Sequence, residues 1–285
     1  MGGQGLMWSS TRVVLCLAVL SLVVSVAGPA AARAGEPLVI AASPSLKGVL
    51  EQLAAGFERS HPDVRVKLHF NTGLAMRQGI AGMQNSMVGR YFIETGPIHL
   101  VAPGGDELIA RLEMKYYVLP GTTRSYAKDQ LVVVVPESLV EAPESLEALS
   151  RSTARLAIAE PGRTILGKQT HQALRALGFA SSFAGRLDEA TDSRGVVDHV
   201  LGGQADAGIV FGHEAVKERD RLRVVAIIKE GYQPEVHSMA MERYCPNRRL
   251  CEEFLAYIQS TEAQTAVRLA GYGLPGTGED LKNHR

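Results

Sequence analysis

Short apolar runs rich in β-branched residues alternate with helical repeats along most of this chain. Eight such runs are typical of buried strands: PLVIAAS, VRVKLHF, IHLVAP, QLVVVVP, RLAIAEP, AGIVFG, RVVAIIK and VHSMAM. Between them, apolar residues recur at three- and four-residue intervals, as in amphipathic helices, in stretches such as SLKGVLEQLAAGFERS, DELIARLEM, LGKQTHQALRALGF and CEEFLAYIQSTEAQTAVRLA. This alternation predicts an α/β fold in which helices cover mostly parallel sheets.

The first 34 residues differ from the rest. Arg12 precedes the apolar run VVLCLAVLSLVVSVA, and the helix-breaking Gly28 and Pro29 and the small-residue stretch AAARAG follow it. A basic residue, an apolar segment and a small-residue site describe a secretory signal peptide, which we expect to be cleaved near Ala34. A membrane anchor is the alternative, although the run is short for a bilayer span. We therefore expect a periplasmic or extracellular protein.

The charge balance argues against several classes of partner. The chain has 30 Lys and Arg against 30 Asp and Glu, and the leader contains two of the basic residues, Arg12 and Arg33, and no acid. The mature protein then carries a net charge of −2. Such a protein has no basic field that attracts nucleic acid or anionic lipid. We expect no nucleic-acid partner.

Two cysteines remain after the leader, Cys245 and Cys251 in YCPNRRLCEEF. In an oxidising compartment this short spacing predicts a disulfide, with two free buried thiols as the alternative. Neither cysteine has a His or Cys at a usual ligand spacing, so we expect no metal site. Nothing in the sequence indicates a cofactor.

Open α/β sheets bind ligands on the loops that follow the carboxyl ends of their strands. Here those loops are short, polar and contain glycine: ASPSLKG, FNTGLAMRQG, AEPGRTILGK, ATDSRGVVDHV and VFGHEA. Backbone amides at helix starts with hydroxyl groups beside them suit a small anion. Ser45 is expected at or beside a helix N-cap, however, and a capping role alone explains a serine there.

An exported hydrolase is the rival class. Ser43 or Ser45 would be the nucleophile, and His171, His213 or His237 would be the base. Serine catalysis needs a base within hydrogen-bond reach and usually a glycine-flanked elbow. Ser45 is instead followed by leucine and lysine, as in a helix cap. We therefore expect a binding protein and not an enzyme.

Taken in order, the motifs resemble those of periplasmic molybdate-binding proteins. The resemblance runs through AASPSLKGVLEQLAAGFERSHPDVRVKLHFNTG, YAKDQLVVVVP, RLAIAEPGRTILGKQTHQALRALG, TDSRGVVDHVLGGQADAGIVFGHEAV and GYGLPG. It implies two α/β lobes, residues 37–127 with 233–285 and residues 128–232, that close over an oxyanion. A monomer of this kind passes its ligand to the membrane permease of an ABC importer. A ligand sensor with the same fold remains open.

The resemblance also implies binding residues. Ser45 corresponds to the first family serine, whose hydroxyl and amide meet an oxyanion oxygen. The second family serine falls on Gly73, with Thr72 beside it. Ligand-facing amides fall at Leu166 and Ser193.

Three departures bear on the ligand. Phe211 stands where the family has a tyrosine hydroxyl, and His99, in GPIHL, replaces a family aspartate. Residues 81–96 fit neither period and resemble an inserted surface segment. A site of neutral donors favours a fully ionised tetrahedral dianion, molybdate or tungstate, which these residues do not distinguish. Phosphate carries a proton at neutral pH, and sulfate differs only in size.

Overall fold

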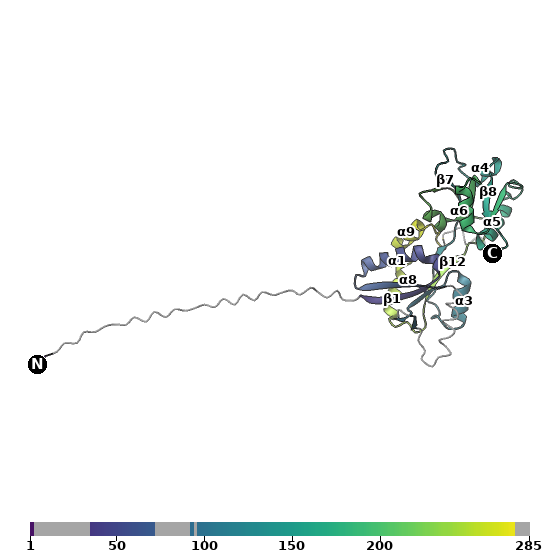
Figure 1. Ribbon diagram of the computed structural model, residues 1–285. Coiled ribbons are helices and arrows are strands. Elements are labelled where there is room, and N and C mark those ends of the chain that lie inside the picture. The colour runs from purple at the N-terminus through teal and green to yellow at the C-terminus, as the bar shows by residue number, and fades with distance from the viewer. Residues whose placement is uncertain (3–34, 72–91, 94–95, 277–285) are drawn as a thin grey trace. The chain divides into compact units, whose positions relative to one another are not determined.

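Two five-stranded sheets form the part of the protein that follows Gly35 (Figure 1). The computed structural model describes residues 1–2, 35–71, 92–93 and 96–276. Residues 1–34 and 35–285 are separate units, and the predicted signal peptide lies almost wholly outside the described residues. No helix in the described ranges is long and apolar enough to cross a membrane.

Both sheets have the same topology. The first has the order β2 (Val64–Phe70), β1 (Glu36–Ala42), β5 (Leu100–Ala102), β12 (Val236–Met241) and β6 (Arg124–Lys128). The second has the order β9 (Leu187–Ala190), β8 (Leu156–Ala159), β10 (Ala207–Phe211), β7 (Leu131–Pro136) and β11 (Leu222–Ile228). A separate hairpin pairs β3 (Phe92–Ile93) with β4 (Gly96–Pro97).

Strand direction follows from the route of the chain. The chain leaves the first sheet after β6, enters the second at β7, and returns from β11 to β12. β7 and β12 are antiparallel to both of their neighbours, while the other strands of each sheet run in one direction. The predicted α/β class is therefore confirmed, and the strand that enters from the other sheet is the antiparallel one. The predicted lobe boundaries lie in or beside these crossings and stay a prediction.

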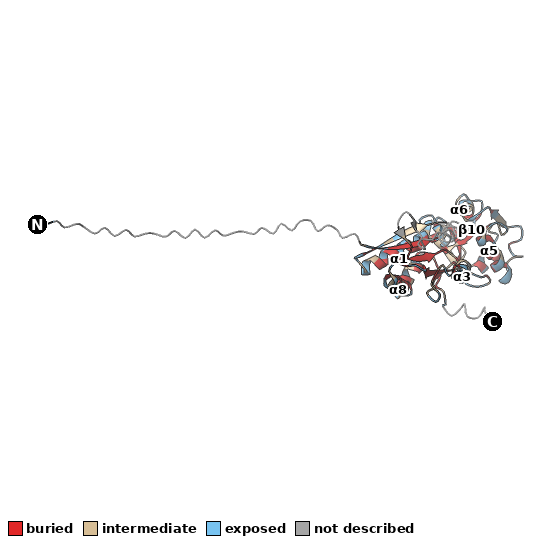
Figure 2. Cartoon of the chain, turned by 90° about the horizontal axis from the view of Figure 1, so that it is seen from below, coloured by how far each residue is buried: buried red, intermediate tan, exposed pale blue. Residues whose placement is uncertain are grey.

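Helices pack against each sheet. α1 (Lys47–Ser60), α3 (Asp106–Met114), α8 (Arg248–Tyr257) and α9 (Thr261–Leu269) belong to the first half, and the 3-10 turn η1 (Pro44–Leu46) precedes α1. α4 (Leu146–Arg151), α5 (Ile165–Ala176), α6 (Ser193–Leu201) and α7 (Gly212–Lys217) belong to the second. The buried residues lie along the strands and the inner helix faces (Figure 2), and each half has its own apolar core.

All eight predicted strands exist, but some other elements differ from expectation. β6 and β9 were not predicted because RSYAK and LDEA contain no apolar run. The helix predicted over residues 251–270 is two helices, α8 and α9, because the Ser260 side chain accepts a hydrogen bond from the Ala263 amide (3.2 Å) and starts a new helix. The sulfurs of Cys245 and Cys251 lie at disulfide distance in the core of the first half.

Gly167 allows α5 to begin against the end of β8. A Cβ atom at this position would overlap the Ala159 carbonyl oxygen and would lie 2.5 Å from the Glu160 carbonyl oxygen. Both obstacles are backbone atoms and cannot rotate away. The first turn of α5 is therefore placed by a contact that only glycine permits.

We predict that Gly167→Ala lowers the free energy of unfolding by about 3 kcal/mol, because overpacking against backbone forces α5 to shift. Gly48→Ala is the control, since a Cβ there meets nothing within 4 Å on the exposed side of α1. It should be neutral or should stabilise by up to about 1 kcal/mol. Urea unfolding measures both, and equal stabilities of the two variants would contradict this steric account.

Candidate functional site

Ser43 and Ser45 follow the carboxyl end of β1, beside the loop that follows β5. The Ser43 amide donates to the Ala102 carbonyl (3.0 Å), which ties the two loops together. Gly104 has a φ of +76°, and a Cβ there would lie 3.2 Å from the Cβ of Ser43. The hydroxyl oxygens of the two serines lie 3.0 Å apart, and Ser45 is exposed. The first sheet thus presents a pair of hydroxyl groups at the carboxyl end of β1.

Neither hydroxyl caps a helix. Ser43 precedes η1 without a side-chain cap bond, and the N-cap of α1 is Leu46. Ser45 therefore lies beside the N-cap, as predicted, but its side chain does not satisfy a helix amide. Within a hydroxyl pair one group donates to the other, so the second hydrogen of the pair remains for another acceptor.

Tyr272 connects the Ser45 loop to the C-terminal part of the chain. Its hydroxyl donates to the Ser45 carbonyl (3.1 Å), and its ring stacks on His213 with centroids 4.9 Å apart. The His213 ring in turn stacks on Phe211 at 5.6 Å. Phe211 therefore packs in a three-ring stack. Sequence reasoning assigned no role to Tyr272, and GYGLPG was its only signal.

Asp129 lies where the chain crosses between the sheets and contacts two imidazole rings. Its Oδ1 lies 3.1 Å from His237 Nε2 and 3.6 Å from His213 Nδ1. His237 Nδ1 accepts from the Gly105 amide (3.2 Å), so the ring proton is on Nε2 and points to Asp129. Both nitrogens of His237 are thus engaged away from the serines. Within the described ranges, no three His, Cys, Asp or Glu side chains are arranged to hold a metal ion.

In the second half, α5 and α6 begin after β8 and β9. The Thr164 side chain accepts from the Gly167 amide (2.9 Å), and the Asp192 side chain accepts from the Gly195 amide (2.9 Å). Each cap satisfies only the third amide of its helix. The amides of the first two helical residues, which include Leu166 and Ser193, have no acceptor within the helix. These are the two amides that the resemblance assigns to ligand binding.

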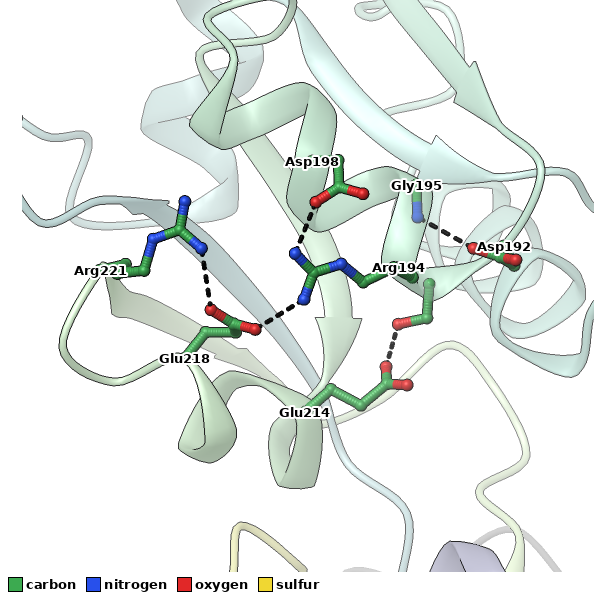
Figure 3. A network of polar contacts seen from close by, with 8 residues as sticks. Asp192, Arg194, Gly195, Asp198, Glu214, Glu218 and Arg221 are labelled. Carbon is green, nitrogen blue, oxygen red and sulfur yellow. Dashed lines mark hydrogen bonds and ion pairs between the residues drawn. The ribbon is translucent and has the colours of Figure 1, made fainter.

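Charged side chains around the start of α6 are paired with one another (Figure 3). Arg194 contacts Asp198 (2.7 Å) and Glu218 (2.8 Å), and Glu218 also contacts Arg221. The hydroxyl of Ser193 donates to the carboxylate of Glu214. The side chain of Ser193 is therefore engaged, and its backbone amide is the group left for a ligand.

The remaining sequence candidates divide into two groups. Thr72 and Gly73 lie outside the described residues, as does most of the segment 81–96. His99 is a core residue, 3% exposed, whose Nδ1 accepts from the Val39 amide (3.2 Å). Burial lowers the pKa of His99, against a hydrogen bond with the backbone of Pro97 that raises it. His99 is therefore a packed core residue.

The two equivalent sheets thus have open helix starts at their carboxyl edges, where open α/β sheets bind ligands. The molybdate-binding protein ModA of Escherichia coli is 24% identical over 253 residues, which are 87% of this chain and 93% of that protein.

Two solved structures share the fold. The substrate-binding domain assigned to a molybdenum ABC transporter of Clostridium difficile has a TM-score of 0.72 at 19% identity and covers 84% of this chain and 99% of its own. The periplasmic molybdate-binding protein of Azotobacter vinelandii has a TM-score of 0.55 at 21% identity, with the same coverage of 84% and 99%.

The chain belongs to the bacterial extracellular solute-binding proteins, whose family model matches residues 38–273. The resemblance to periplasmic molybdate-binding proteins is thereby confirmed, with this chain as a divergent member. Members of the family bind solutes for ABC transporters and are not enzymes, which confirms the expectation of a binding protein over a hydrolase.

The ring stack predicts how stability depends on pH. Burial lowers the pKa of His213 to about 4; Asp129 opposes this shift, and Lys217 and His237 add to it. The unfolded chain therefore binds more protons than the folded one between pH 6.5 and about 4, so stability falls as the pH falls through this window. Full loss corresponds to about 3 kcal/mol.

We predict that the unfolding free energy of His213→Gln, which cannot titrate there, falls less than that of the parent protein over this window. Urea unfolding at a series of pH values measures both profiles. Parallel profiles would show that His213 is not held neutral by its surroundings.

Proposed function

We propose that this protein captures a small tetrahedral oxyanion, molybdate or tungstate, outside the cytoplasm and delivers it to the membrane permease of an ABC importer. The observation that carries the proposal is the Ser43–Ser45 hydroxyl pair, which caps no helix at the carboxyl edge of β1. The amides of Leu166 and Ser193, left over by their helix caps, would complete the donor set from the second half. The name of the E. coli relative supports the choice of anion.

The chemistry of these donors suits a dianion without a proton. Hydroxyl groups and helix-start amides offer hydrogens and partial positive charge but no full cation. Enclosure strengthens each bond, because water no longer screens it. Arg194 is already neutralised by Asp198 and Glu218, so a bound anion would rely on the neutral donors.

Phe211 removes one donor from the family pattern. Its ring stacks on His213, so the site loses a hydroxyl and gains an apolar wall. Thr72 and Gly73, which follow β2, would supply donors from the first half. The proposed ligand set is therefore Ser45, Thr72, Gly73, Leu166 and Ser193, with Phe211 beside it.

The same proposal includes the processing of the chain. Cleavage near Ala34 would release a monomer into the periplasm or extracellular space, with lobes formed by residues 37–127 and 233–285 and by residues 128–232. Cys245 and Cys251, whose sulfurs lie at disulfide distance, would form a disulfide that serves stability alone.

We predict that Ser45→Ala weakens molybdate binding more than tenfold, about 1.4 kcal/mol, with little loss of stability because the hydroxyl caps no helix. Ser145→Ala is the matched control. The Ser145 side chain accepts from the Ala148 amide (3.0 Å) at the start of α4, so its loss should cost about 1 kcal/mol of stability and leave affinity unchanged.

Calorimetry with molybdate measures the affinity of each variant, and urea unfolding measures the stability of each. Equal affinity of Ser45→Ala and the parent protein would remove Ser45 from the site. A panel of molybdate, tungstate, sulfate and phosphate in a thermal-shift assay adds the specificity, because a tightly bound anion raises the melting temperature by mass action.

A further inference from the structure

Glu214 connects two residues of the proposed anion site. Its carboxylate accepts the hydroxyl hydrogen of Ser193 (Figure 3), and the backbone amide of Phe211 also hydrogen-bonds to it. The contact with Phe211 is the one a capping box makes, since Phe211 is the N-cap of α7 and Glu214 is its third residue. The contact with Ser193 spans two helices and has no such local explanation. A carboxyl group thus lies at the edge of the proposed anion site.

The surroundings of Glu214 raise its pKa above that of an ordinary glutamate. Burial is the main cause that raises its pKa, and Asp129 on the chain crossing raises it further. The Ser193 hydroxyl from α6, Lys217 from α7 and the Phe211 amide lower it. Glu214 in turn adds to the raised pKa of the Tyr272 phenol, after burial and Asp129. The result is a carboxyl group that is easier to protonate than an ordinary glutamate.

A dianion at the Ser193 amide would add two negative charges beside this carboxylate. Like charges at such short range disfavour the ionised carboxylate, so binding and protonation assist each other. Once protonated, the carboxyl group has an O–H to donate, whereas the carboxylate can only accept. That donor would replace the hydroxyl that Phe211 lacks.

We propose that Glu214 takes up a proton from solvent when the oxyanion binds, and that the resulting O–H serves as a donor in the loaded site. The proposal rests on the proposed function. Its sign follows from linkage: if the pKa of Glu214 is higher in the loaded protein than in the empty one, affinity rises as the pH falls between those two values. One proton gives at most about a tenfold gain per pH unit.

Calorimetry with molybdate, run in buffers of different ionisation enthalpy between about pH 6 and pH 8.5, counts the protons taken up. The parent protein should take up protons on binding, up to about one per anion where the pH lies between the pKa values of Glu214 in the empty and the loaded protein. Glu214→Gln should take up no protons other than those that bind to molybdate itself, and its affinity for molybdate should depend only weakly on pH. Glu218→Gln is the matched control on the same face, since Glu218 pairs with Arg194 and Arg221. It should retain the proton uptake of the parent.

The outcomes separate this inference from the one it rests on. Molybdate binding by the parent protein without proton uptake would overturn the role of Glu214 and leave the proposed function standing. Equal pH dependence in the parent and in Glu214→Gln would do the same. If neither molybdate nor tungstate binds the parent protein at any pH, both proposals fall.

Discussion

A buried carboxylate at the chain crossing holds together the segments on which the candidate site is built. Asp129 is 5% exposed, and a charge so buried needs partners to offset its desolvation. Its hydrogen-bond partner is the imidazole of His237, and the ring of His213 packs beside it with Nδ1 at 3.6 Å. His237 Nδ1 accepts a hydrogen bond from the amide of Gly105, and the neighbouring Gly104 lies close to Ser43. The His213 ring stacks on Tyr272, whose hydroxyl donates to the Ser45 carbonyl. The position of the serine pair therefore depends on this carboxylate from two sides.

The equivalence of the two sheets explains which groups are left for a ligand. Gly105 and Phe211 occupy matching places, each the N-cap of the helix that follows the third strand of its sheet. The amides of both residues already donate hydrogen bonds to side chains, that of Gly105 to His237 and that of Phe211 to Glu214. The loops after the first two strands of each sheet remain. In the second half these loops lead into capped helices whose first amides are open. In the first half the loop after β1 has a hydroxyl pair that caps no helix, and most of the loop after β2 lies outside the described residues.

The sequence predicts the features that are encoded by a few neighbouring residues, and it misses those that depend on distant parts of the chain. Eight strands contain apolar runs or alternating apolar residues, so all eight were predicted even though β2 and β11 are only partly buried. β9, in contrast, has the sequence LDEA and depends on its pairing with β8. The candidate amides at Leu166 and Ser193 came from family motifs around helix starts, which are local features. The contact between Ser193 and Glu214 joins residues 21 apart, and that between Asp129 and His237 joins residues 108 apart. Such contacts depend on how helices and crossings pack, and no short pattern encodes them.

Anomalous diffraction at the molybdenum edge from crystals grown with molybdate tests the central claim most directly. The account predicts a single strong peak within hydrogen-bond distance of the Ser45 hydroxyl and of the backbone amides of Leu166 and Ser193, with the ring of Phe211 beside it. A peak bound elsewhere on the protein, or no ordered molybdate at saturating concentration, would contradict it.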